Sequence, residues 1–216
     1  YVFNEIGGSA DTDGYSYEIQ GGVAAKFDRV TAQLAAGLFW SDSADQGALL
    51  GDSPNLGNSV KVSGSTTNFL ADFQVVYVRG ELAWKISDRK LWGTPCMLTI
   101  SGEYDKNLPD AWDDLDQATD QQDTDQTEGY TGQVAFGGNR KKGEWQVAYQ
   151  YKHLEADAVW DAFTDSDFGT GGTDRKGHIV KATYNFQEWW QLGFAAFITE
   201  KISDFPNSGN HTRGNS

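Results

Sequence analysis

The stretch that decides the fold is residues 15–40, YSYEIQGGVAAKFDRVTAQLAAGLFW. Up to Phe27 the odd positions are apolar or glycine, and most even positions between them are polar or small. The alternation resumes after Asp28–Arg29, with the apolar residues now at even positions from Val30 to Trp40. A period of two is typical of β-strands whose two faces meet different surroundings. The pattern therefore predicts two antiparallel strands joined by a two-residue turn.

The same alternation recurs along the rest of the chain. It appears in 76–86, 96–107, 130–138, 145–152, 178–186 and 190–201, and a further strand is expected at residues 1–5. The segments reach about ten residues, which suits strands that cross a bilayer at a tilt. A soluble β-sandwich also alternates, but its strands average about 5–6 residues. Two strand-based folds, a membrane barrel and a sandwich, thus compete.

Aromatic residues favour the barrel. They stand at the ends of the apolar faces, as at Tyr17, Phe27 and Trp84, and aliphatic residues fill the middles. Aromatic girdles around an aliphatic band mark the two membrane interfaces of outer-membrane barrels. We therefore predict an all-β fold: an antiparallel up-and-down transmembrane β-barrel, with about nine strands of a larger barrel of at least ten strands in this chain. The residues expected to face lipid are Ile19, Leu34, Leu82, Ile100, Val134, Val147, Val180 and Phe194.

The connections alternate in length. Short ones are expected at 28–29, 87–95, 139–143 and 187–189, and long ones at 41–68, 108–129 and 155–177. Outer-membrane barrels have short periplasmic turns and longer extracellular loops, so the long set should lie outside the cell. Residues 1–216 are expected to form a single outer-membrane β-barrel domain. An odd strand number also suggests a fragment that lacks at least one returning strand.

Composition excludes several functions. The chain has 216 residues, with 17 Lys and Arg against 31 Asp and Glu, a formal net charge of −14. This charge argues against a nucleic-acid partner. Mean hydropathy is −0.56, and no apolar run reaches the roughly 18–20 residues of a membrane helix. One Cys and three His leave no disulfide framework or Cys-based zinc site. We expect no metal and no cofactor.

A family resemblance follows from the second half of the chain. Its motifs are NRKKGEW at 139–145, YQY at 149–151, LEADAV at 154–159, DAFTDSDF at 161–168, and GGTD with KGH within 171–178. Together they resemble the C-terminal region of a bacterial family of outer-membrane porins, over about 139–201. Residues 104–107, YDKN, are similar to an upward strand of that family. The resemblance implies a β-barrel pore of Gram-negative-type bacteria, and a fragment that lacks N-terminal strands and the last C-terminal strand. It carries over no catalytic residues.

The polar strand face would line such a pore. Its charged members are predicted to be pore-lining: Glu18, Lys26, Arg79, Glu81, Lys85, Glu103, Asp105, Lys152, Lys181 and Lys201. Six of these are positive and four negative, an imbalance too small to define selectivity. The function expected is an outer-membrane porin with a water-filled channel for passive diffusion of small hydrophilic solutes or ions. The alternatives are cross-strand charge pairs that stiffen the wall, a structural scaffold barrel of an envelope complex, or a soluble β-rich binding domain.

Other features leave alternatives open. The acidic stretch 108–128 is a solvated loop, a divalent-cation site or a cation bridge to lipopolysaccharide. Loop 155–177, with Trp160, Phe163 and Phe168, folds inward as a constriction, packs on a neighbouring subunit or forms a local cluster. An enzyme is not expected, because no Ser accompanies the His residues at 153 and 178 on the apolar face. The expected partners are outer-membrane lipid and lipopolysaccharide, small hydrophilic solutes, and copies of the chain in a trimer or envelope proteins.

Overall fold

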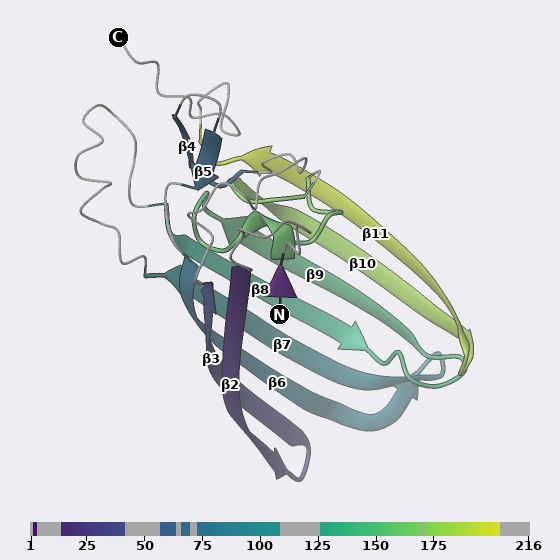
Figure 1. Cartoon of the computed structure of the whole chain (residues 1–216). Helices are drawn as coiled ribbons and strands as arrows, with labels where there is room; N and C mark the ends of the chain where they lie inside the picture. The colour runs from purple at the N-terminus through teal and green to yellow at the C-terminus, as the bar shows by residue number, and fades with distance from the viewer. Residues whose placement is uncertain are drawn as a thin grey trace.

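The computed structural model describes residues 2–3, 14–41, 57–63, 66–69, 73–108, 126–169 and 171–203. They form one curved antiparallel sheet in which neighbours in sequence are neighbours in space (Figure 1). Its strands are β1 (Val2–Phe3), β2 (Gly14–Phe27), β3 (Val30–Ser41), β6 (Phe73–Leu91), β7 (Thr94–Asn107), β8 (Glu128–Gly137), β9 (Trp145–Leu154), β10 (Arg175–Gln187) and β11 (Trp190–Lys201). A separate hairpin pairs β4 (Val60–Ser63) with β5 (Thr66–Phe69), and η2 (Asp161–Phe163) is a short 3₁₀-helix.

The all-β, up-and-down architecture predicted from the alternation is confirmed. The sheet has nine strands in the order β1-β2-β3-β6-β7-β8-β9-β10-β11, and β1 contributes only two residue pairs. Among the described residues β11 pairs with β10 alone, so the sheet is not closed. Its curvature and strand order are those of part of a β-barrel wall.

Three predicted connections were wrong in extent. The expected turn 87–95 is a two-residue turn at Trp92–Gly93, because β6 and β7 continue through the polar residues beyond Lys85. Both turn residues have positive φ, 48° and 88°, as in the tight turns that suit twisted hairpins. A register shift between Lys85 and Lys90 interrupts the pairing and hides the alternation there. The expected loop 41–68 contains the β4–β5 hairpin, and loop 155–177 ends where β10 begins at Arg175.

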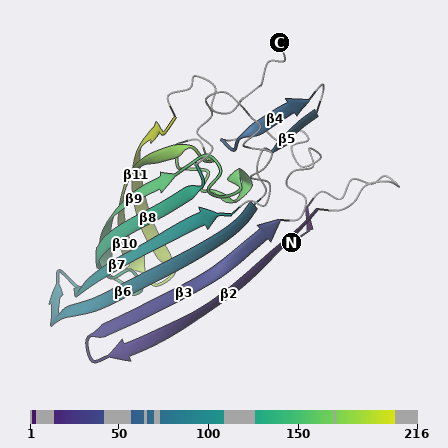
Figure 2. The ribbon, with the colours of Figure 1, turned by 90° about the vertical axis from the view of Figure 1, so that its left-hand side faces the viewer.

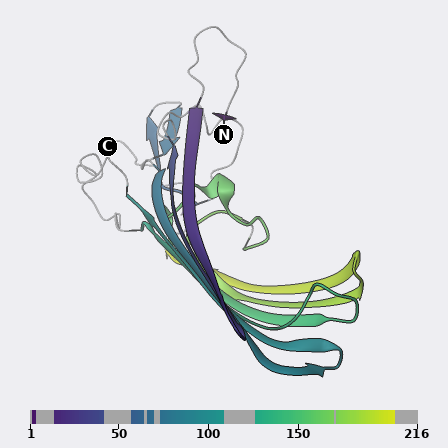
Figure 3. The same ribbon diagram turned by 90° about the horizontal axis from the view of Figure 1, so that it is seen from below.

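The two faces of the sheet meet different surroundings. The eight residues predicted to face lipid are all exposed on the convex face, with exposed fractions from 41% for Val180 to 72% for Ile19. Figures 2 and 3 show a single curved layer, and among the described strands no second sheet covers that face. Buried side chains such as Phe73, Val75 and Ile179 lie on the concave side. The sandwich alternative therefore does not describe this chain.

Aromatic rings mark both ends of the convex face. At the turn end Phe136 packs on Trp145, and Phe186 stacks on Trp190. At the loop end Tyr17 contacts Trp40. Tyr17 and Phe27 lie ten residues apart on β2, which is about 34 Å along a strand and about 24 Å of height at a tilt of about 45°. This matches the roughly 25 Å apolar band of an outer-membrane barrel. No helix among the described residues is long and apolar enough to cross a membrane.

The short turns lie at one end of the sheet, and the strand ends that lead into the long connections lie at the other (Figure 2). Trypsin added to intact cells should therefore leave the Arg140–Lys142 turn uncut, because this turn would lie on the periplasmic side. The same protease should cut it once the outer membrane is permeabilised, since all three side chains are exposed. Cleavage between residues 139 and 143 in intact cells would contradict this orientation.

Candidate functional site: the concave face of the sheet

Strand register brings four polar residues into one row across the concave face. Arg79 of β6 pairs with Glu103 of β7, Glu103 with Thr131 of β8, and Thr131 with Lys152 of β9. Residues directly opposite in an antiparallel ladder point to the same face with Cβ atoms about 4.5–5.5 Å apart. The alternation of each strand alone places these residues on the polar face, and the register sets them side by side.

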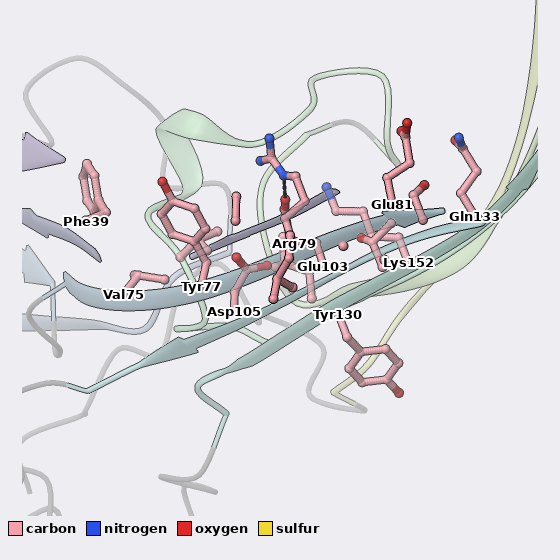
Figure 4. Close-up of a pocket in the computed structure, with 18 of the residues that line it drawn as sticks. Phe39, Val75, Tyr77, Arg79, Glu81, Glu103, Asp105, Tyr130, Gln133 and Lys152 are labelled. Carbon is pink, nitrogen blue, oxygen red and sulfur yellow. Dashed lines mark hydrogen bonds and ion pairs between the residues drawn. The ribbon is translucent and has the colours of Figure 1, made fainter. Parts of the chain in front are cut away.

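A cavity of about 1170 Å³ lies over this row. In Figure 4 the side chains of Tyr77, Arg79 and Glu81 rise on one side of the sheet, whereas Tyr130 extends from the other. Six of the residues predicted to line a pore line this cavity: Glu18, Arg79, Glu81, Glu103, Asp105 and Lys152.

The other four predicted lining residues do not reach the cavity. Lys85 forms a 2.7 Å ion pair with Asp88 near the turn end of β6. Lys181 donates to Gln150 Oε1 at 3.3 Å. Lys26 pairs in register with Thr31, and Lys201 with Arg175. The structure thus divides the predicted set into a group gathered around one cavity and a group along the rest of the face.

Charge pairing accounts for part of the cavity wall. Arg79 Nε lies 2.6 Å from Glu103 Oε2, so the expectation of cross-strand pairing holds for this pair. Tyr77 donates its hydroxyl proton to Glu18 Oε1 over 2.5 Å. The Tyr77 ring reaches Glu18 by lying across Gly37, where a Cβ atom would collide with the ring. Among the described residues Glu81 and Asp105 form no ion pair.

An inner loop, formed by residues 155–169 and 171–174, covers part of the concave face. It leaves β9, includes η2 and lies within the curve of the sheet (Figure 3). Its Trp160 stacks on Phe73 of β6 with ring centroids 6.2 Å apart, and its Phe163 meets Phe39 of β3 at 5.4 Å. Phe168 is buried, with Lys152 Nζ 5.3 Å from its ring centroid. Of the three alternatives for this loop, the structure agrees with inward folding.

Asn58 attaches the inner loop from outside the sheet. Its Nδ2 donates to the carbonyl oxygens of Ala156 and Val159 at 2.7 and 2.8 Å, and its Oδ1 accepts from the backbone N–H of Asp161 at 2.8 Å. Asn58 is completely buried. A second asparagine, Asn107 at the end of β7, donates to the carbonyl oxygen of Asp157 at 2.9 Å. These attachments were missed in the sequence, because a single Asn in a polar stretch carries no periodic signal.

Asp157 is a titratable group among these attachments. Its Oδ1 accepts from the backbone N–H of Ser59 at 2.8 Å. Burial raises the pKa of this carboxyl from 3.8 to about 6, and the nearby carboxylates of Asp161 and Asp174 act in the same direction. The hydrogen bonds from Ser59 oppose the rise. Asp161 and Asp174 are themselves buried.

The docking of the inner loop should weaken as pH rises from about 4 to about 6. The pKa of Asp157 is higher in the docked loop than in an undocked one, so the docked state binds the proton more tightly and loses this advantage as pH rises. Hydrogen exchange of the loop amides, corrected for intrinsic rates, should show more opening at pH 7 than at pH 4.5. Asp157→Asn should flatten the difference, and an equal pH response in both proteins would contradict the assignment.

The two histidines on the convex face contact tyrosines. The His153 ring stacks on Tyr130 with centroids 4.8 Å apart, and His178 Nδ1 lies 2.7 Å from the Tyr149 hydroxyl. Both histidines stand near the loop end of their strands, where aromatic and polar groups meet the membrane interface. No group of His, Cys, Asp and Glu among the described residues could hold a metal ion. The acidic stretch 108–128, with its proposed cation site, lies almost wholly outside the described residues.

Taken together, an apolar convex face, aromatic girdles and a polar concave face with an inward loop define a wall of the porin type. A family model described as "Putative porin" matches residues 53–212, and the chain belongs to that family. The match extends the resemblance of 139–201 towards the N-terminus. Membership supports a porin-like role and in general an outer-membrane location, and it favours a channel over an enzyme. No curated protein and no solved structure matches the chain.

Proposed function

We propose that this protein forms a water-filled channel through the outer membrane for the passive diffusion of small hydrophilic solutes or ions. The observation that carries the proposal is the contrast between the two faces of one sheet. The convex face is aliphatic and exposed at its centre, while the concave face holds a cavity lined by charged side chains. A sheet in lipid must close, because unpaired backbone groups at its edges are too costly there. Closure places the charged face inside.

The side chains on the concave face suit a water-filled interior better than a dry, packed core. A second row lies two positions nearer the turn end of the strands than Arg79. It is formed by Glu81, Ser101, Gln133 and Gln150, whose polar side chains cannot pack as an apolar core. A barrel wider than about eight strands leaves room that side chains do not fill. The inner loop occupies part of that room, so the narrowest passage should lie between the loop and the wall of β3, β6 and β7.

The contacts proposed outside the channel follow from the same two faces. The aliphatic band would meet outer-membrane lipid, and the ion-paired rim at the loop end would meet the headgroups of lipopolysaccharide. Lys106–Glu128 at 3.0 Å and Lys176–Glu200 at 3.5 Å belong to that rim. We also propose that the convex face forms the contacts between copies of the chain in a trimer, or the contacts with envelope proteins.

Planar lipid bilayers test the channel directly. The purified protein should produce stepwise, ohmic increases in current. A protein that inserts but never conducts would favour the scaffold barrel of an envelope complex. A protein that is monodisperse without detergent would favour the soluble binding domain, and either result would overturn the channel.

A further inference from the structure

The charged side chains around the cavity are not balanced. Five carboxylates line it, against the two cationic side chains of Arg79 and Lys152. The carboxylates are Glu18, Glu81, Glu103, Asp105 and Asp165. Four of them come from the strand faces, and Asp165 comes from the inner loop. The predicted lining set contained more cations than carboxylates, and the structure reverses this balance at the cavity.

Both cations are held by side chains of the wall or of the inner loop. Arg79 forms its 2.6 Å ion pair with Glu103. Lys152 lies over the Phe168 ring and interacts with the carboxylates of Asp165, Asp105 and Glu103. A cation bound in this way offers little positive charge to a passing anion. Glu81 forms no ion pair among the described residues, so its charge remains directed at the cavity. The Asp105 carboxyl is half-buried beside Lys152, so it contributes less charge there.

Aromatic side chains form one corner of the same cavity. Phe163 of the inner loop is 50% exposed. The centroid of its ring lies 5.4 Å from that of Phe39 and 5.3 Å from that of Trp160. Glu18 is the register partner of Phe39, so its carboxylate stands beside this aromatic pair. An aromatic face next to a carboxylate is an arrangement that attracts organic ammonium ions through cation–π and ionic contacts.

We propose that this cavity favours cations over anions, and that organic ammonium ions bind at the corner formed by Glu18, Phe39 and Phe163. The proposal rests on the channel function proposed above and names the class of solute that uses it. Carboxylates that line a passage raise the local concentration of cations and repel anions. The aromatic corner adds a further attraction. An alkylated ammonium ion gains more from it than K⁺ does, because K⁺ keeps its hydration shell.

Ion preference is tested by reversal potentials in a KCl gradient across a planar bilayer. The wild-type channel should prefer K⁺ over Cl⁻. Glu81→Gln should lower the permeability ratio by up to about fivefold, the Boltzmann factor for a unit charge about 4 Å from the ion in water. Asp105→Asn should lower the ratio less, because that carboxyl is half-buried beside Lys152. Glu188→Gln removes a carboxylate at the β10–β11 turn, away from the cavity, and should leave the ratio unchanged.

The outcomes separate this proposal from the channel itself. A conducting channel without preference, or with preference for Cl⁻, would overturn the cation filter and leave the channel intact. An equal drop in the ratio for Glu188→Gln and the two cavity variants would also overturn it, because the effect would then not belong to the cavity. A protein without any conductance would instead count against the channel.

The ammonium corner has its own measurement. The permeability of tetramethylammonium relative to K⁺ should fall in Phe163→Leu and in Phe39→Leu, because both changes keep an apolar side chain but remove the aromatic face. Phe39 belongs to β3 rather than to the loop, so this second variant reports on the corner even if the loop shifts. Phe186→Leu changes an aromatic residue of the convex face and serves as the control. An unchanged relative permeability in both cavity variants would overturn the corner.

Discussion

Asn58→Ala should release the inner loop and raise the single-channel conductance. The change removes three hydrogen bonds of 2.7 to 2.8 Å between a buried side chain and the loop backbone. Each lost bond costs about 1 kcal/mol, and a buried carbonyl left without a partner costs more. A total of about 2–4 kcal/mol would shift the docking equilibrium of the loop by a factor of about 30 to about 900. A passage narrowed by a loop should widen when the loop leaves it.

The control for this variant is Asn139→Ala. Asn139 lies in the exposed turn between β8 and β9, and its side chain makes one long contact of 3.4 Å with Gln146. Its replacement should leave conductance and loop exchange unchanged. Hydrogen exchange of residues 155–169 should rise in Asn58→Ala alone. Faster exchange without a change in conductance would show that the loop does not narrow the passage, and unchanged exchange would contradict the anchoring role of Asn58.

Val134→Arg should destabilise the folded protein in a bilayer by about 2–4 kcal/mol, the cost of a charge on the lipid face near the midplane. Val134 lies in the middle of β8 on the convex face, between Ile100 of β7 and Tyr149 of β9. Its side chain is 46% exposed, with no described segment above it that could shelter a guanidinium group. The measurement is the free energy of unfolding by guanidinium chloride in lipid vesicles.

The neighbouring residue gives a matched comparison. Gln133→Arg introduces the same charge one position earlier on β8, on the polar face beside Ser101 and Gln150. A charge there stays in water, so this variant should unfold within about 0.5 kcal/mol of the wild-type protein. Equal destabilisation by the two variants would contradict the assignment of the faces. A larger cost at 133 would reverse it.

Local sequence determined which residues form strands and which face each side chain takes. Side chains alternate with a period of two in any extended strand, so the apolar set from Ile19 to Phe194 could be assigned from sequence alone. The structure confirms that assignment for all eight residues. The prediction failed where alternation stops, as in the polar end of β6 between Lys85 and Leu91, because a strand in water on both faces has no hydrophobic pattern.

Only part of the candidate site could be predicted from the sequence. Alternation placed Arg79, Glu103 and Lys152 on the polar face, but it could not show that register puts them in one row. Pairing between strands is a non-local property, since it depends on the partner strand as much as on the residue itself. The same limit applies to the inner loop. The sequence showed the unusual aromatics of 155–177, and only the folded chain decides that they pack on Phe39 and Phe73.

Sequence by itself thus determined the fold class, the two faces of the wall and the family of the chain. Tertiary structure decided the charge at the cavity, because it left Lys26, Lys85, Lys181 and Lys201 away from it and brought Asp165 to it. The physical reason lies in the range of the interactions. A strand face is fixed by the geometry of neighbouring residues, whereas a cavity collects side chains from β2 to the inner loop, and Asn58 holds that loop across about one hundred positions of sequence.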